Sequence, residues 1–223
     1  MDIRQVWPAT LFIALVLMAC ARPTSESEFN GTPLKSGDIA PNFALTNQAG
    51  RSVSLESLKG HVVVLTFLYT NCPDVCPIVT SHLREVEERL GPEGNDAQFV
   101  AVSVDPDRDS VESAREYLNK WGLSGNWQFL VGDRPELEEV WKAYYLDPAV
   151  SSHDPLESGQ ADPTPEPGGA IGELSAEIAK RYLVVHSTPV FLIDRQGKRR
   201  VVFTPPLEPE EVAEDIRLLL GDA

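Results

Sequence analysis

The sequence predicts one α/β domain with parallel strands, because strand-like and helix-like patterns alternate along most of the chain. Three runs have the composition of strands buried between layers: "HVVVLTFLY" at 61–69, "AQFVAVSVD" at 97–105 and "WQFLVG" at 127–132. A segment with helical spacing follows each of them. Such alternation is typical of a sheet that is covered by helices.

The helical segments are recognised by apolar residues three and four positions apart and by glycine at their ends. After Pro77, apolar residues recur at Val79, Leu83, Val86 and Leu90, and Gly91 is a stop signal. We expect Pro77 in the first helical position, with Cys76 just outside the helix. The other predicted helices are 109–122, 135–146 and 208–220, and the other predicted strands lie near 37–60, 181–186, 190–194 and 199–203.

The first twenty residues have the layout of a secretory signal. The apolar run "LFIALVLMA" follows a short polar segment, and "LMAC" ends at Cys20. The run has only about half of the roughly 20 residues of a membrane-spanning helix, which favours a cleaved signal. "LMAC" resembles the lipobox of bacterial lipoproteins, which implies lipidation of Cys20 and a protein held at a membrane outside the cytoplasm; a plain signal peptide or a short uncleaved anchor is the alternative.

The expected organisation has a signal peptide at 1–20, a flexible tether at 21–36 and one domain at 37–223. Residues 21–36 are polar and rich in small residues, which is typical of a tether. Residues 147–172 are rich in proline, glycine and acidic side chains without periodicity. We therefore expect 147–172 to be a surface loop inserted into the domain.

The charge balance excludes some partners. The chain has 34 acidic and 19 basic residues, a formal net charge of −15. This balance argues against nucleic acid and against anionic lipid as electrostatic partners.

The segment "TNCPDVCPIVT" at 70–80 contains two of the three cysteines. Export implies an oxidising compartment, and lipidation of Cys20 leaves Cys72 and Cys76 as a pair. A thiol at a helix N-terminus has a lowered pKa, so it is either reactive or a soft metal ligand. A purely structural disulfide is disfavoured because so small a loop removes little chain entropy.

A strand that leads into a cysteine pair at a helix start suggests a thioredoxin-like fold, a mixed central sheet flanked by helices. Pro189, in the "TP" after His186 and Ser187, matches the proline loop that faces the cysteines in such proteins. "FLYTNCPDVCP" resembles the cysteine motif of the Sco/SenC family of copper proteins in cytochrome c oxidase assembly. "SVDPDRDS" at 103–110 resembles that family's aspartate motif, and "YLVVHST" resembles its histidine segment.

The resemblance implies copper ligands at Cys72, Cys76 and His186, and supporting roles for Asp105, Asp109 and Pro189. Two thiolates and an imidazole suit Cu(I) and tolerate Cu(II). Capping of a turn or helix by Asp109 and Ser110 is an equally good reading of the aspartates. The implied protein is a copper chaperone rather than an enzyme, with the Cu(A)-bearing oxidase subunit or another copper acceptor, a thiol–disulfide reductant and a membrane as partners.

Three other functions remain open at this point. A thiol–disulfide reductase would use Cys72 and Cys76 as its redox pair and would not need His186. A peroxidase would oxidise one cysteine and resolve it with the other. A zinc site with two thiolates and one histidine is chemically possible, but the motif resemblance favours copper.

Overall fold

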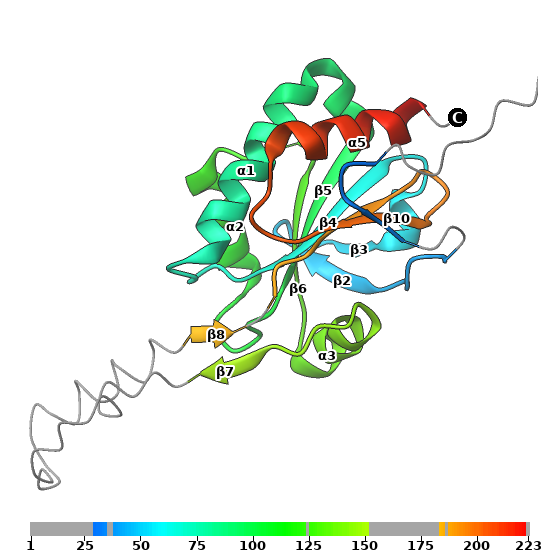
Figure 1. The fold of residues 1–223 in the computed structure, drawn as a ribbon. Coiled ribbons are helices and arrows are strands. Elements are labelled where there is room, and N and C mark those ends of the chain that lie inside the picture. The colour runs from blue at the N-terminus through cyan, green and yellow to red at the C-terminus, as the bar shows by residue number, and fades with distance from the viewer. Residues whose placement is uncertain (1–28, 35–37, 124, 152–182, 186, 222–223) are drawn as a thin grey trace, which may run out of the picture.

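The computed structural model describes residues 29–34, 38–123, 125–151, 183–185 and 187–221, which form a mixed sheet and its covering helices (Figure 1). Eight strands make the sheet in the order β1-β10-β9-β4-β5-β6-β2-β3. β4 pairs with β5 and β5 with β6 in parallel, and the flanking pairs are antiparallel. The strands are β1 (Thr32–Pro33), β2 (Ala44–Asn47), β3 (Ser52–Ser54), β4 (Val62–Leu68), β5 (Ala97–Ser103), β6 (Trp127–Val131), β9 (Val190–Ile193) and β10 (Arg199–Phe203).

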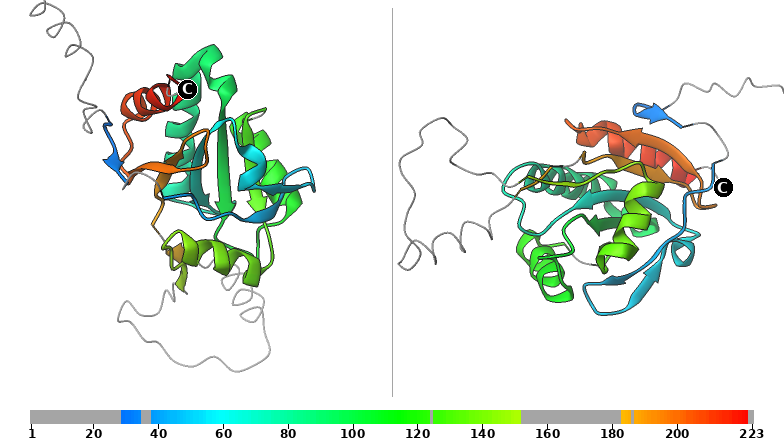
Figure 2. Two further views of the ribbon diagram at one scale, coloured as in Figure 1. Left: turned by 90° about the vertical axis from the view of Figure 1, so that its right-hand side faces the viewer. Right: turned by 90° about the horizontal axis from the view of Figure 1, so that it is seen from below.

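Helices cover both faces of this sheet (Figures 1 and 2). α1 (Val75–Leu90) connects β4 to β5 and α2 (Val111–Trp121) connects β5 to β6. Both helices lie on one face of the sheet, as expected for right-handed crossovers between parallel strands. α5 (Pro209–Gly221) packs beside α1, whereas α3 (Arg134–Ala143) lies on the opposite face. The described residues also form two short 3-10 helices, Leu55–Leu58 and Gly91–Asp96. The predicted α/β class with a central mixed sheet is confirmed.

The centre of the sheet is buried on both sides, as the apolar runs predict. All seven residues of β4 are buried, and so are six of the seven residues of β5, the exception being Gln98. On α1, the four apolar positions predicted from their spacing are all buried against the sheet. β4 ends at Leu68, and the chain passes from it directly into the cysteine motif.

The N-terminal part differs from the predicted tether. Residues 29–34 lie within 21–36, yet Thr32–Pro33 pairs with β10 as strand β1. The buried carboxylate of Asp215 on α5 explains this docking, because it accepts hydrogen bonds from the N–H groups of Asn30 and Gly31 at 2.8 and 3.0 Å. A contact between residues so far apart in sequence leaves no local pattern.

The predicted loop 147–172 also contains a strand. Ala149–Ser151 forms β7, which pairs antiparallel with β8 (Leu183–Val185) in a separate two-stranded sheet. The pairing satisfies backbone groups of both segments, and only β8 has a strand-like sequence. The remainder of the predicted loop, 152–172, lies outside the described residues.

Tyr145, which follows α3, has a backbone conformation that tyrosine rarely adopts. Its φ is 61°, and it is the one non-glycine residue with positive φ in the described part of the chain. Glycine adopts this conformation without steric cost and commonly occupies such a position after a helix. The ring cannot offset this cost by burial, since Tyr145 is 85% exposed.

Replacing Tyr145 by glycine is therefore expected to raise the free energy of unfolding by about 0.5–1 kcal/mol. Tyr145→Ala is the matched control, because alanine removes the ring but keeps the steric cost. Urea denaturation of the three proteins measures the effect. A glycine variant that is less stable than wild type would show instead that the tyrosine ring makes stabilising contacts.

Candidate metal centre

The two cysteines lie where the central strands end. We call the residues that directly follow β4, β5 and β6, together with those that directly precede β9, the carboxyl edge of the sheet. From this edge the loop 69–74 leads to α1, and it contains Cys72, which is half-buried, while Cys76 is buried within α1. Both are free thiols. The Cys76 N–H donates to Cys72 Sγ at 3.3 Å, and this hydrogen bond joins the first turn of α1 to the loop that contains Cys72.

The start of α1 differs from the prediction. The helix begins at Val75, so Cys76 is its second residue rather than the residue before it, and Pro77 is the third. Proline is tolerated there because the N–H groups of the first turn have no partner within the helix. One of these N–H groups, that of Cys76, donates to the sulfur of Cys72.

The two thiols have opposite pKa shifts. A hydrogen bond from the Cys76 thiol is the main cause that lowers the pKa of Cys72 to about 6, and backbone donors from Asp74 and Cys76 add to it against the effect of burial. The same hydrogen bond, followed by burial, raises the pKa of Cys76 well above its usual range. At neutral pH the reduced pair therefore carries one thiolate, on the more exposed sulfur of Cys72.

Alkylation of the reduced, copper-free protein should report this asymmetry. Cys72 is expected to react with iodoacetamide at a rate that rises with pH through about 6, whereas Cys76 reacts far more slowly. Mass spectrometry of the alkylated peptide separates the two sites, and Cys76→Ala, which removes the side-chain donor, should move the Cys72 profile to higher pH. Equal reactivity of the two cysteines would contradict the assignment.

Asp109 holds the cysteine loop to the end of β5. Its carboxylate accepts hydrogen bonds from Thr70 N–H at 3.0 Å, Thr70 Oγ1 at 2.6 Å and Ser103 Oγ at 2.6 Å. Burial raises its pKa to about 6, and the bonds from Ser103 and Thr70 oppose that rise. Ser110, the next residue, caps α2 through a hydrogen bond with Ser113. Asp109 thus stabilises the loop, and Ser110 rather than Asp109 caps the helix.

Asp105 lies on the same edge and pairs with a cation. The buried Asp105 carboxylate forms an ion pair with Arg108, whose guanidinium carbon is 5.5 Å from the centre of the Tyr69 ring. Tyr69 and Thr70 directly precede the cysteine motif. The sequence reasoning did not identify Tyr69, Thr70 or Arg108, because their role depends on contacts between two loops.

The histidine segment returns to this edge. β9 pairs antiparallel with β4, so its first residues lie beside the last residues of β4, and Thr188 and Pro189 are buried immediately before it. Pro189 therefore lies at the edge from which the cysteine loop starts. His186, the predicted third ligand, and Cys20, the predicted lipidation site, lie outside the described residues.

The predicted site residues are thus only partly brought together. Within the described ranges, no three histidine, cysteine or acidic side chains gather closely enough to hold a metal ion. Asp105 and Asp109 contact the residues around the cysteine loop rather than joining the sulfur atoms as a ligand cluster. Two adjacent sulfur donors nonetheless fit a soft cation such as Cu(I).

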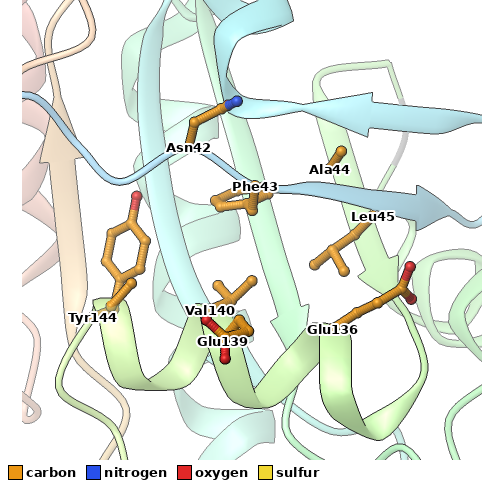
Figure 3. A pocket seen from close by; sticks show the side chains of 9 residues that line it. Asn42, Phe43, Ala44, Leu45, Glu136, Glu139, Val140 and Tyr144 are labelled. Carbon is orange, nitrogen blue, oxygen red and sulfur yellow. The ribbon is translucent and has the colours of Figure 1, made fainter.

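The hollow in Figure 3 is separate from this centre. It lies between α3 and the segment 42–45 and has a volume of about 310 Å³. Phe43, Leu45, Val140 and Tyr144 are its buried apolar residues, and Glu136 and Glu139 are exposed. Because its lining residues include no cysteine or histidine, it is not a candidate copper site.

A match between this chain and a protein-family model shows which family the chain belongs to. The SCO1/SenC family model matches residues 31–162, more than half of the chain, and this stretch includes both cysteines and both motif aspartates. The chain belongs to the SCO1/SenC family. The resemblance seen in the sequence motifs is confirmed, although the matched range of this SCO1/SenC chain ends before His186.

Individual relatives of this SCO1/SenC chain agree with that placement. The SCO1 protein homolog of Bacillus subtilis is 39% identical over 129 residues, which cover 57% of this chain and 63% of that protein. The match thus spans a little under two thirds of the relative's length. Bradyrhizobium japonicum ScoI, solved with copper bound, is 28% identical with a TM-score of 0.62, covering 81% of this chain and 99% of that one.

Another similar solved structure is that of BsSco, a member of the Sco family of cytochrome c oxidase assembly proteins. A disulfide switch has been identified in BsSco. It is 25% identical to this SCO1/SenC chain with a TM-score of 0.61, and covers 86% of this chain and 98% of that one. These relatives support the thioredoxin-like assignment, and a copper-bound member is among them.

Proposed function

We propose that this protein is a copper chaperone held at a membrane outside the cytoplasm, which delivers copper to the Cu(A) centre of cytochrome c oxidase. Cys72, Cys76 and His186 are the proposed ligands. The observation that carries the proposal is the pair of free, adjacent thiols at the start of α1, in a chain related to a copper-bound ScoI. Asp109 and Asp105 are proposed to support the ligands by fixing the loop before Cys72.

The chemistry of the pair suits transfer of a metal ion. A thiolate on half-buried Cys72 gives copper an accessible first ligand, and buried Cys76 a second. An acceptor thiolate forms a bond to copper while the bond to Cys72 breaks, so the ion moves without a change in oxidation state. Copper is the cargo in this scheme, and no reaction is catalysed.

Metal titration tests the proposal. The reduced protein, residues 29–223, is titrated with Cu(I) against a competing chelator and then with Cu(II) under absorbance. The expected result is tight one-to-one binding with a thiolate-to-copper charge-transfer band for Cu(II). Binding no tighter than that of a short dithiol peptide would reject the copper proposal.

A thiol–disulfide reductase is the second candidate, and the disulfide switch of the BsSco relative favours keeping it. The Cys72 thiolate would attack a partner disulfide and release one partner thiol. Cys76, after losing its proton, would attack the sulfur of Cys72 and release the second thiol. The partner gains two electrons, and this protein becomes the Cys72–Cys76 disulfide. Reduction of a partner disulfide at an unchanged rate by His186→Ala would favour this role.

The location rests on the N-terminal sequence. We infer a signal at 1–20, lipidation of Cys20 and a tether that ends where the chain docks at Asn30 on Asp215. In the described part of the chain, no helix has both the length and the apolar character that crossing a membrane requires. Metabolic labelling with a fatty acid, compared with Cys20→Ser, tests the lipid anchor.

A further inference from the structure

Large apolar side chains are rarely exposed in the part of the chain that the structure describes. Among the described residues only three are, Ile39 at 67%, Ile78 at 53% and Tyr145 at 85% exposure. Single exposed apolar residues need no explanation, but those that cluster around a site often mark an interface. The positions of Ile39, Ile78 and Tyr145 relative to the cysteines therefore show which of them can belong to an interface.

Ile78 lies at the carboxyl edge, on the α1 side. It is the fourth residue of α1, two residues after Cys76, and it is exposed where its helical neighbours Val79 and Leu83 are buried. The first turn that contains Ile78 also contains Cys76, whose N–H donates to the half-buried sulfur of Cys72 at 3.3 Å. A partner that contacts Cys72 therefore approaches this turn.

Tyr145 lies at the same edge, on the α3 side. The Nε1–H of Trp141 donates to the carbonyl oxygen of Ser103, the last residue of β5, at 3.0 Å. The ring of Tyr144 is 5.7 Å from the ring of Phe67, which is the last but one residue of β4. The end of α3 thus lies beneath the ends of the central strands, and Tyr145 projects from it on a sterically costly backbone.

Ile39 lies at the opposite edge. It forms an isolated bridge with Lys198, next to the turn that joins β9 to β10, and this turn lies beside the start of β4. Ile78 and Tyr145 therefore flank the carboxyl edge that contains the cysteines, one on each side. Ile39 lies far from the cysteines and serves as the control.

Unpaired carboxylates accompany both residues at the carboxyl edge. Asp74 precedes α1, and Asp147 follows Tyr145 by two positions. In the parts of the chain that the structure describes, neither has an ion-pair partner within 4.0 Å. The formal net charge of −15 adds a long-range field of the same sign. A partner with basic residues around an apolar centre complements this surface.

We propose that Ile78 and Tyr145 form a two-part docking surface for the protein that exchanges copper with Cys72. The partner is a folded protein whose metal-binding thiols lie in an apolar surface rimmed by lysine or arginine. The surface straddles the sheet, with one anchor on each face and the cysteines between. This inference rests on the proposed copper transfer and names the residues that select the partner.

The test compares transfer to a protein with transfer to a small molecule. The copper-loaded protein is mixed with a soluble, reduced Cu(A)-bearing domain of an oxidase subunit, and separately with a small Cu(I) chelator. Ile78→Ser and Tyr145→Asn should each slow transfer to the protein about tenfold, as expected for truncated interface anchors. Ile39→Ser should leave that rate unchanged, and all three should match wild type with the chelator. Asparagine tolerates the backbone of Tyr145, so the variant keeps its fold.

Salt dependence tests the charges independently. Transfer to the protein should slow as ionic strength rises from about 0.01 M to 0.15 M, and Asp147→Asn should weaken this dependence. If Ile78→Ser and Tyr145→Asn transfer copper as fast as Ile39→Ser, the docking surface is wrong and the proposed function stands. If wild type loads the chelator but never the protein domain, copper delivery itself is wrong and the docking surface falls with it.

Discussion

Cys72→Ser is expected to weaken Cu(I) binding by roughly 10²- to 10³-fold, the size expected when one of three or four ligands of a tightly bound ion is lost. Serine keeps the shape of the loop but replaces a soft thiolate with a hard oxygen that stays protonated at neutral pH. Cys76→Ser should have an effect of the same size. Competition with a Cu(I) chelator gives the affinities, and circular dichroism shows that each variant is folded.

His186→Ala separates the two candidate functions. If copper binding requires the imidazole, affinity falls and the charge-transfer band of the Cu(II) form shifts. His61→Ala is the matched control, because His61 precedes β4 at the end opposite to the cysteines. An affinity and a spectrum that are the same for both histidine variants would remove His186 from the ligand set and leave a dithiol redox pair.

Asp109→Ala is expected to lower the free energy of unfolding by about 2–4 kcal/mol. The substitution leaves the N–H and hydroxyl of Thr70 and the hydroxyl of Ser103 without the acceptor that they share. It also releases the loop before Cys72, so copper affinity should fall although no ligand is lost. Asp109→Asn keeps one acceptor oxygen and should fall between alanine and wild type near neutral pH.

The raised pKa of Asp109 also predicts how the free energy of unfolding changes with pH. The folded-state pKa of Asp109 is raised to about 6 by burial, above the value of 3.8 of an unperturbed carboxyl. Between about pH 4 and pH 6 the native state binds more protons than the unfolded chain. The stabilising contribution of Asp109 is therefore full below about pH 4 and is lost as pH rises through about 6. Relative to Asp109→Asn, wild type should lose up to about 3 kcal/mol between these limits.

Urea unfolding of both reduced, copper-free proteins at several pH values measures that difference. The comparison with Asp109→Asn removes the contributions of other carboxyl groups, which titrate in both proteins. A difference that stays constant between pH 4 and 7 would mean that Asp109 is ionised throughout. The effect on copper affinity would then arise from geometry alone.

The sequence predicted the elements whose pattern is local. The fully apolar run of β4 and the spacing of Val79, Leu83 and Val86 depend only on which residues face the core, so strand, helix and their order could be read directly. The same holds for the cysteine pair at a helix start. Motif order then pointed to the family, which the comparisons confirm.

The structural features that the sequence did not predict depend on contacts between residues that are far apart in the sequence. Strand β7 forms because Leu183–Val185 supplies its pairing partner, and β1 docks because Asp215 supplies acceptors to Asn30 and Gly31. Asp109 looks like a helix cap beside Ser110, and only the fold shows that its carboxylate faces Thr70. Such contacts satisfy buried polar groups between loops, and no periodicity records them.

The pairing of β7 with β8 has a practical consequence. Ser151 lies opposite Leu183, so the chain leaves and re-enters the folded body at neighbouring points whatever stands between them. The entropic cost of closing such a loop grows slowly with length, by about 0.6 kcal/mol for each doubling. The junction at Ser151 and Leu183 is therefore a candidate insertion point for protein engineering, because a segment joined there starts and ends at two paired residues.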